Sequence, residues 1–259
     1  MKPLLEMQPD EVLEPSWLET YRQMVEILTS EFVRLRTTRM MLARLRAFPF
    51  PLFTLPDIEH FWDLVDLSFF ETCVMILWRA VIDTDVKGRR TLKHLKNDVV
   101  IHCKPHVAPG LNLALATVEF DKSEIQIEAR IRDLRSRLIA HLDLTRQLTS
   151  EHAAPMPAPL TMSDLEVMET AVEKQFALLC FGRQTALVPW GYAAGLTGQP
   201  RVGDFPDLEA LLDSVARSSA MLNNPEQHPE HWTLIRASLS QDDLRNINGY
   251  RTKFGMPTV

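Results

Sequence analysis

The stretch Phe61–Asp83, FWDLVDLSFFETCVMILWRAVID, decides the fold class, because it is the most apolar run in the chain. Three acidic residues, Asp63, Asp66 and Glu71, interrupt it. A membrane-spanning helix would not readily accept these charges. The apolar residues fall on nearly every face of a helix, which is typical of a helix buried in a protein core. We therefore predict a core helix over residues 57–82 rather than a membrane span.

Other helices are predicted along the rest of the chain. Only 9 of the 259 residues are glycine, and no stretch shows the alternation of β-branched residues that is typical of strands. Pairs of Ser or Asp with Glu three residues later indicate helix N-termini at Ser16, Asp121 and Ser163, and prolines limit the C-terminal ends. The predicted helices cover residues 16–45, 57–82, 91–102, 121–149, 163–187 and 207–222, with one or two short helices after Pro225 and a loop over 102–110.

These elements predict an all-α fold, a helical bundle of about five main helices with long antiparallel core helices. Residues 1–203 are assigned to the bundle domain. Residues 204–259 are assigned to a C-terminal helical extension that packs on the bundle or reaches a partner. No internal repeat is apparent.

Charge and cysteine content limit the functional classes. The formal net charge is −6, so no global basic field attracts nucleic acid, and any RNA or DNA binding has to be local. The three cysteines, Cys73, Cys103 and Cys180, are odd in number and far apart, which fits reduced thiols in the cytosol. His102, Cys103 and His106 lack the second ligand pair of a zinc site, so we predict no metal and no cofactor.

The C-terminal part of the first predicted helix is strongly basic. Two interpretations of its arginines stay open: compensation of the helix dipole at a C-terminus, or a surface that faces phosphate. The residues concerned are Arg34, Arg36, Arg39, Arg44 and Arg46.

The stretch Arg135–Asp143, RSRLIAHLD, lies within the predicted helix 121–149 and carries the candidate site. On a helical wheel His141 lies within roughly 20° of the face of Leu134, and Arg135 lies roughly 120° around the helix from His141. The two side chains therefore cannot easily meet within one straight helix. In a twofold dimer both edges of the same face are brought together. That face is an apolar stripe of Ile127, Ile131, Leu134, Leu138 and Leu142.

The run Arg135-Ser136-Arg137-Leu138-Ile139-Ala140-His141 resembles the signature of HEPN domains, an arginine followed by a histidine after four to six residues. Its local form resembles the abortive-infection type U HEPN-like family. The preceding segment 78–98, WRAVIDTDVKGRRTLKHLKND, resembles that family as well: an apolar helix, a turn that contains Asp, and a short helix. The resemblance covers roughly residues 17–187.

The resemblance implies a helical bundle, a homodimer and, in active members, a metal-independent endoribonuclease with two motifs meeting at the dimer cleft. Its setting would be a bacterial defence or toxin–antitoxin system in the cytoplasm, with RNA as substrate and an antitoxin or other protein as partner. His141 would exchange the proton of a ribose 2′-OH or of the leaving oxygen. Arg135 would stabilise the charged transition state, and Ser136 would donate a hydrogen bond. Arg137 and Asp143 are the candidate substrate-binding residues.

One departure from the family pattern and one alternative function remain. HEPN toxins regulated by adenylylation often carry a tyrosine two residues after the histidine, and Asp143 occupies that position here. Tyrosine modification at this point is therefore excluded. Because some HEPN proteins are scaffolds, the alternative is a non-catalytic helical dimer that binds a protein partner.

Overall fold

A computed structural model describes residues 3–53, 56–82, 91–117, 129, 131–132, 161–182 and 206–259. Nearly all regular structure in these ranges is helical, and their only β feature is an isolated bridge between Leu13 and Cys103. The predicted all-α fold class is confirmed. Within the same ranges, no helix combines the length and the hydrophobicity that crossing a bilayer would require.

The chain divides into two compact units. Unit 1 consists of residues 1–39 and 69–197, and unit 2 consists of residues 40–68 and 198–259. The boundaries fall inside two helices, α2 (Leu18–Arg46) and α4 (Pro56–Leu77), so each unit contains a part of both. The predicted assignment of residues 1–203 and 204–259 to a bundle and an extension stays a prediction.

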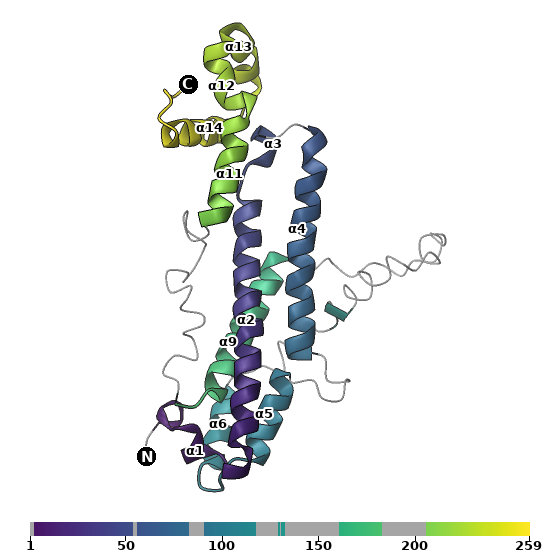
Figure 1. Cartoon of the computed structure of the whole chain (residues 1–259), viewed down its shortest axis with the longest axis vertical. Coiled ribbons are helices and arrows are strands. Elements are labelled where there is room, and N and C mark those ends of the chain that lie inside the picture. Colours follow the sequence, from purple (N-terminus) through teal and green to yellow (C-terminus); the bar gives the residue numbers. More distant parts are fainter. Residues whose placement is uncertain are drawn as a thin grey trace, which may run out of the picture. The chain divides into compact units, whose positions relative to one another are not determined.

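Unit 1 contains the larger hydrophobic core. Its buried residues come from the N-terminal segment, from α2 and α4, and from the helices that follow them. Phe32 of α2 and Phe176 of α9 pack edge to face there, with ring centroids 5.0 Å apart. The described elements of unit 1, besides the parts of α2 and α4, are η1 (Leu4–Glu6), α1 (Pro9–Val12), η2 (Pro15–Trp17), η3 (Trp78–Ile82), α5 (Leu92–Ile101), α6 (Ala108–Thr117) and α9 (Met162–Leu179) (Figure 1).

Helix α2 runs antiparallel to α9 in unit 1. Near the start of α2, the Tyr21 hydroxyl donates to the Leu179 carbonyl at 2.8 Å, at the end of α9. Further along α2, Arg39 pairs with Glu169, which lies nearer the start of α9. The Glu31 carboxylate of α2 also accepts from Arg79 of η3, at 3.1 Å. The prediction of long antiparallel core helices agrees with these pairings.

Unit 2 is built around the end of α2 and four C-terminal helices. Tyr250 of α14 packs edge to face on Phe48 and Phe53, with ring centroids 5.7 and 5.0 Å away. These contacts join the C-terminal helices to the connection between α2 and α4. The remaining elements of the unit are α3 (Phe50–Phe53), α11 (Pro206–Ser218), α12 (Ala220–Gln227), α13 (Pro229–Ser238) and α14 (Gln241–Lys253).

The first predicted helix starts two residues later than expected. Ser16 lies inside the 3₁₀ turn Pro15–Trp17, and α2 begins at Leu18. The sequence interpretation also missed the short helix α1, which is capped by reciprocal bonds between Gln8 and Glu11. A capping-box pattern in sequence therefore indicated the region of the helix start and not its exact position.

Helix α9 differs from its prediction at both ends. The residues that cap its N-terminus are Thr161 and Asp164, not Ser163 and Glu166. It ends at Leu179 rather than Leu187, where the Tyr21 hydroxyl accepts from the backbone N–H of Phe181 at 3.0 Å. Gly182 then has φ +67°, and a Cβ there would lie 2.4 Å from the Gln8 side-chain oxygen. This positive φ favours glycine at the turn.

Two other differences involve proline and serine. The last three residues of the predicted loop 102–110 belong to α6, which begins at Ala108. Pro109 does not prevent this, because backbone N–H groups in the first turn of a helix have no partner within the helix. The predicted helix 207–222 is divided into α11 and α12 at Ser219, whose hydroxyl accepts from the N–H of Met221 at 3.1 Å. The predicted short helices near the C-terminus are confirmed as α13 and α14.

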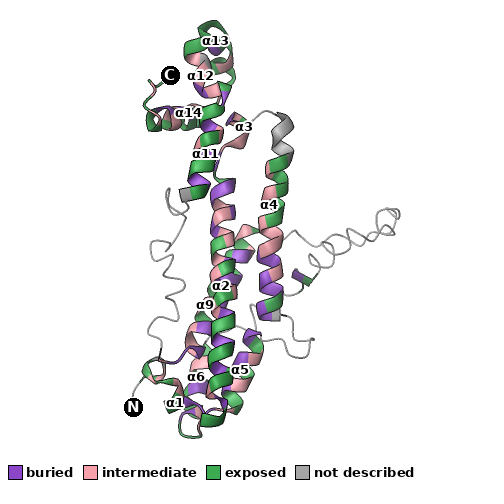
Figure 2. Ribbon diagram, in the orientation of Figure 1, coloured by how far each residue is buried: buried purple, intermediate pink, exposed green. Residues whose placement is uncertain are grey.

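Helix α4 is buried along only part of its length, although its sequence predicts a core helix throughout. Figure 2 shows mainly buried and intermediate residues in its C-terminal half and many exposed residues nearer its N-terminus. Phe61, Leu64 and Leu67 are 57%, 63% and 45% exposed. The interpretation of α4 as a core helix is therefore wrong for these three positions.

Arg251 provides a test of how unit 2 is held together. Its guanidinium is completely buried and donates to the carbonyls of Leu222 and Pro257 and to the Glu226 carboxylate. We expect Arg251→Met to destabilise the protein by about 1–3 kcal/mol, because the carbonyl of the buried Leu222 loses its donor. Urea unfolding followed by circular dichroism measures this change. Arg245→Met on the same helix removes an exposed pair with Asp242 and should cost under about 0.5 kcal/mol; equal losses for both variants would contradict the assignment.

Candidate functional site

The five residues predicted to form the site lie outside the described residues. They are Arg135, Ser136, Arg137, His141 and Asp143. Their catalytic and substrate-binding roles therefore stay predictions. What the structure describes is the segment directly before them, residues 131–132, and the other described parts of unit 1.

The segment that leads into the motif is packed into unit 1. Ile131 is completely buried and belongs to the hydrophobic core of that unit. The guanidinium carbon of Arg132 lies 5.2 Å from the ring centroid of Trp78, which is a cation–π distance. Ile131 is one of the five residues of the predicted apolar stripe, and its burial is confirmed. Trp78 opens the π-helical turn η3, a type of turn that is often found at functional sites.

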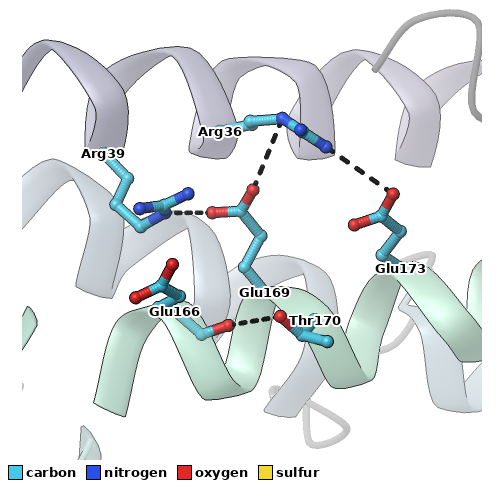
Figure 3. Close-up of polar contacts among 6 residues, drawn as sticks. All are labelled: Arg36, Arg39, Glu166, Glu169, Thr170 and Glu173. Atoms are coloured by element: carbon cyan, nitrogen blue, oxygen red, sulfur yellow. Dashed lines mark hydrogen bonds and ion pairs between the residues drawn. The ribbon is translucent and has the colours of Figure 1, made fainter. Parts of the chain in front are cut away.

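A buried cluster of charges joins α2 to α9 in the same unit. Figure 3 shows Glu169 between the guanidinium groups of Arg36 and Arg39. The Arg36 Nε lies 3.8 Å from a Glu169 oxygen, and its Nη1 lies 3.6 Å from a Glu173 oxygen. The Glu169 side chain is 5% exposed and each arginine side chain is 12% exposed. These groups are largely removed from water, so each one depends on its partners.

The electrostatics of the cluster are those of a structural ion-pair network. Burial raises the pKa of the Glu173 carboxyl, Arg36 lowers it, and the neighbouring Glu169 carboxylate raises it. The net direction is upward. Because the carboxylates already occupy both guanidinium groups, Arg36 and Arg39 are not presented to an external phosphate. The cluster positions α9 against α2 and supplies no reacting group.

Two further arginines of α2 pair with carboxylates in unit 2. Arg44 donates through both Nε and Nη2 to Glu209, and the Nη2 bond measures 2.9 Å. This hydrogen bonding raises the pKa of the Arg44 guanidinium against the effect of burial. Arg46 forms the same kind of fork with Asp66, at 2.7 and 2.8 Å.

These pairings decide between the two interpretations of the basic segment residue by residue. Arg44 and Arg46 lie in the last turn of α2, where dipole compensation applies. Arg36 and Arg39 instead belong to the ion-pair network between α2 and α9. The phosphate-facing alternative is wrong for Arg36, Arg39 and Arg44, whose largely buried guanidinium groups pair with carboxylates. Arg34 and Arg46 are the exposed residues of the set. The spacing of Glu166, Glu169 and Glu173 along α9 was the available signal, since residues three or four apart share a helix face.

His102 has a packing role in unit 1. Its ring stacks on Trp17 with centroids 5.1 Å apart and an interplanar angle of 13°. Its Nδ1 lies 3.4 Å from a Glu14 carboxylate oxygen. Among the described residues, no three His, Cys, Asp or Glu side chains are grouped so that they could hold a metal ion. All three cysteines are buried as thiols in unit 1.

Sequence interpretation missed a pocket of about 310 Å³ in unit 2. It lies where α2 ends and α4 returns, and aromatic and charged side chains share its lining. The signal in the sequence was the phenylalanine- and proline-rich connection FPFPLF, residues 48–53, close to Trp62.

No family model matches the chain, and neither a curated protein nor a solved structure is significantly similar to it.

Proposed function

We propose that this chain is a HEPN-like, metal-independent endoribonuclease of a bacterial defence or toxin–antitoxin system. It acts in the cytoplasm as a homodimer, with an antitoxin or another protein as its regulator. The observation that carries this proposal is the Arg135–His141 motif, in a helix that the sequence pattern predicts. Support comes from the all-α fold, which the resemblance implies.

The proposed chemistry needs only the side chains of the motif. His141 takes the proton of a ribose 2′-OH, and the resulting oxygen attacks the adjacent phosphorus. The P–O5′ bond breaks, the 5′ oxygen receives a proton, and a 2′,3′-cyclic phosphate remains on the other fragment. Arg135 binds the non-bridging oxygens as their charge rises, and Ser136 donates a hydrogen bond to them. Arg137 and Asp143 contact the RNA chain on either side.

A dimer is proposed because of the positions of Arg135 and His141 around the predicted helix. Arg135 and His141 are predicted to lie roughly 120° apart around one helix. In the proposed dimer, Arg135 of one copy and His141 of the other copy therefore form one site. Leu138 lies on the apolar stripe between them and belongs to the proposed interface. Each dimer would then contain two equivalent sites.

A second candidate function has one specific observation in its favour. Phe61, Leu64 and Leu67 form an exposed apolar row on α4, and such rows mark protein-binding surfaces. A non-catalytic helical protein that binds a partner through this row would show no nuclease activity. Toxicity of the wild type but not of His141→Ala in bacteria favours the enzyme, and absence of toxicity from both favours the binding protein.

Cleavage of RNA in the presence of EDTA tests the proposed function. We expect the purified chain to cut single-stranded RNA at the same rate with and without EDTA, leaving 2′,3′-cyclic phosphate ends. A substrate with a single 2′-deoxy nucleotide at the cut site should resist cleavage there, because the attacking hydroxyl is missing. Cleavage that requires added Mg²⁺, or that continues at the deoxy position, would contradict the proposal.

A further inference from the structure

The pocket in unit 2 has one apolar wall made of aromatic rings. The Phe48 and Phe50 ring centroids are 4.6 Å apart, and those of Phe50 and Trp62 are 4.4 Å apart. Phe48 is buried and also contacts Tyr250. Each ring packs on the next, so the wall is formed without a ligand. A volume of about 310 Å³ accommodates a small ligand or one long side chain.

The lining also contains charged side chains, with two carboxylates and one guanidinium. Arg46 forms its two-bond fork with Asp66, so these two charges offset each other. Asp63 lies one turn before Asp66 on α4, lines the same pocket and is exposed. It forms no ion pair with any residue in the described parts of the chain. Among the described side chains, the pocket therefore carries one negative charge without an ion-pair partner beside its aromatic wall.

We propose that this pocket binds an organic cation with an apolar body. The ammonium or guanidinium group lies at the Asp63 carboxylate, and the apolar body lies against Phe50 and Trp62. Two sources share this chemistry: a free amine, or a Lys or Arg side chain of a protein partner. The proposal does not rest on the proposed nuclease, because no residue of the motif lines the pocket.

The lining discriminates between classes of ligand through charge. Aromatic faces are negative and attract cations. The Asp63 carboxylate attracts the same ligands and repels anions. An anion would have to displace Asp66 from Arg46 to gain a partner, which would leave that carboxylate unpaired. A neutral ligand of the same shape gains only the apolar contacts.

A matched series of three ligands tests the proposal on the full chain. Phenethylamine, 2-phenylethanol and phenylacetate have similar bodies and differ in charge. The readout is the indole N–H resonance of Trp62 in ¹⁵N-labelled protein, identified by its loss in Trp62→Phe. We expect a saturable shift with phenethylamine and at least about fivefold weaker binding of the other two. Equal or tighter binding of the alcohol or the acid, or no saturable shift with the amine, would overturn the proposal.

Two variants separate the pocket charge from general surface charge. Asp63→Asn should weaken phenethylamine binding by about fivefold and leave 2-phenylethanol unchanged. Asp242→Asn removes an exposed carboxylate of α14, outside the pocket lining, and should change neither. Unchanged amine binding in Asp63→Asn would overturn the proposal.

The source of the cation is decided by a second pair of probes. N-acetyl-phenylalanyl-arginine amide is compared with the same compound carrying citrulline, which keeps the shape and loses the charge. Charge-dependent binding tighter than that of phenethylamine assigns the site to a side chain of a protein partner. Charge-dependent binding that is weaker assigns it to a free amine.

Discussion

Replacing His141 by alanine is expected to lower the rate of RNA cleavage about 10²–10⁴-fold, the usual contribution of a general acid–base group. Alanine can neither take the 2′-OH proton nor return one to the leaving oxygen. The arginine that stabilises charge remains, so RNA binding should change far less than turnover. Single-turnover cleavage of a labelled RNA, with binding measured separately, shows this division between rate and affinity.

His106→Ala is the matched control for the histidine variant. His106 is exposed in unit 1 and lies outside the motif. Its replacement should leave cleavage, binding and the circular dichroism spectrum unchanged. Cleavage by His141→Ala at the wild-type rate, with the same spectrum, would remove His141 from the site.

Glu169→Ala is expected to destabilise the protein by about 3–5 kcal/mol, the usual cost of removing one partner from a buried ion pair. Glu169 contacts both Arg36 and Arg39, so its loss takes a carboxylate from two largely buried guanidinium groups. Only Arg36 retains another carboxylate in the cluster, that of Glu173, at 3.6 Å. Urea unfolding followed by circular dichroism measures the change in free energy.

Glu166→Ala is the control on the same helix. Glu166 is exposed, and the hydrogen bond to Thr170 uses its backbone carbonyl rather than its side chain (Figure 3). Its replacement should change the free energy of unfolding by less than about 0.5 kcal/mol. A loss at Glu169 no larger than that at Glu166 would mean that the cluster does not hold α9 against α2.

The helical content of the described chain could be predicted because its signals are local. The apolar run from Phe61 predicted α4 to within one residue at its start, and Thr91 lies at the predicted start of α5 as its cap. Capping and termination were less exact, since they depend on distant partners. Tyr21, about 160 positions before Phe181, ends α9 at a point that no local pattern indicates.

Burial and pairing were harder to predict than helices, for the same reason. An apolar helix of the composition of α4 predicts a core helix, yet Phe61, Leu64 and Leu67 are exposed. The basic part of α2 has two plausible local explanations, and only the carboxylates of other helices decide between them. The pocket in unit 2 also needs residues from two helices and their connection.

The candidate nuclease site differs from the pocket and the ion-pair cluster, which combine residues that are distant in sequence. Its residues are adjacent in sequence, so the motif can be found without a structure. What the sequence pattern adds is their predicted angular separation on one helix. The proposed function therefore places the two halves of each site on different copies of the chain. This shared site is the central claim about function.

The most direct test of that claim is the activity of a purified heterodimer between Arg135→Ala and His141→Ala chains, isolated through a different affinity tag on each. In this heterodimer one site lacks both residues and the other retains both. We predict about half the wild-type cleavage rate per dimer, since one of two equivalent sites is restored, while both mutant homodimers stay inactive. A heterodimer as inactive as the two homodimers would contradict a site shared between two chains.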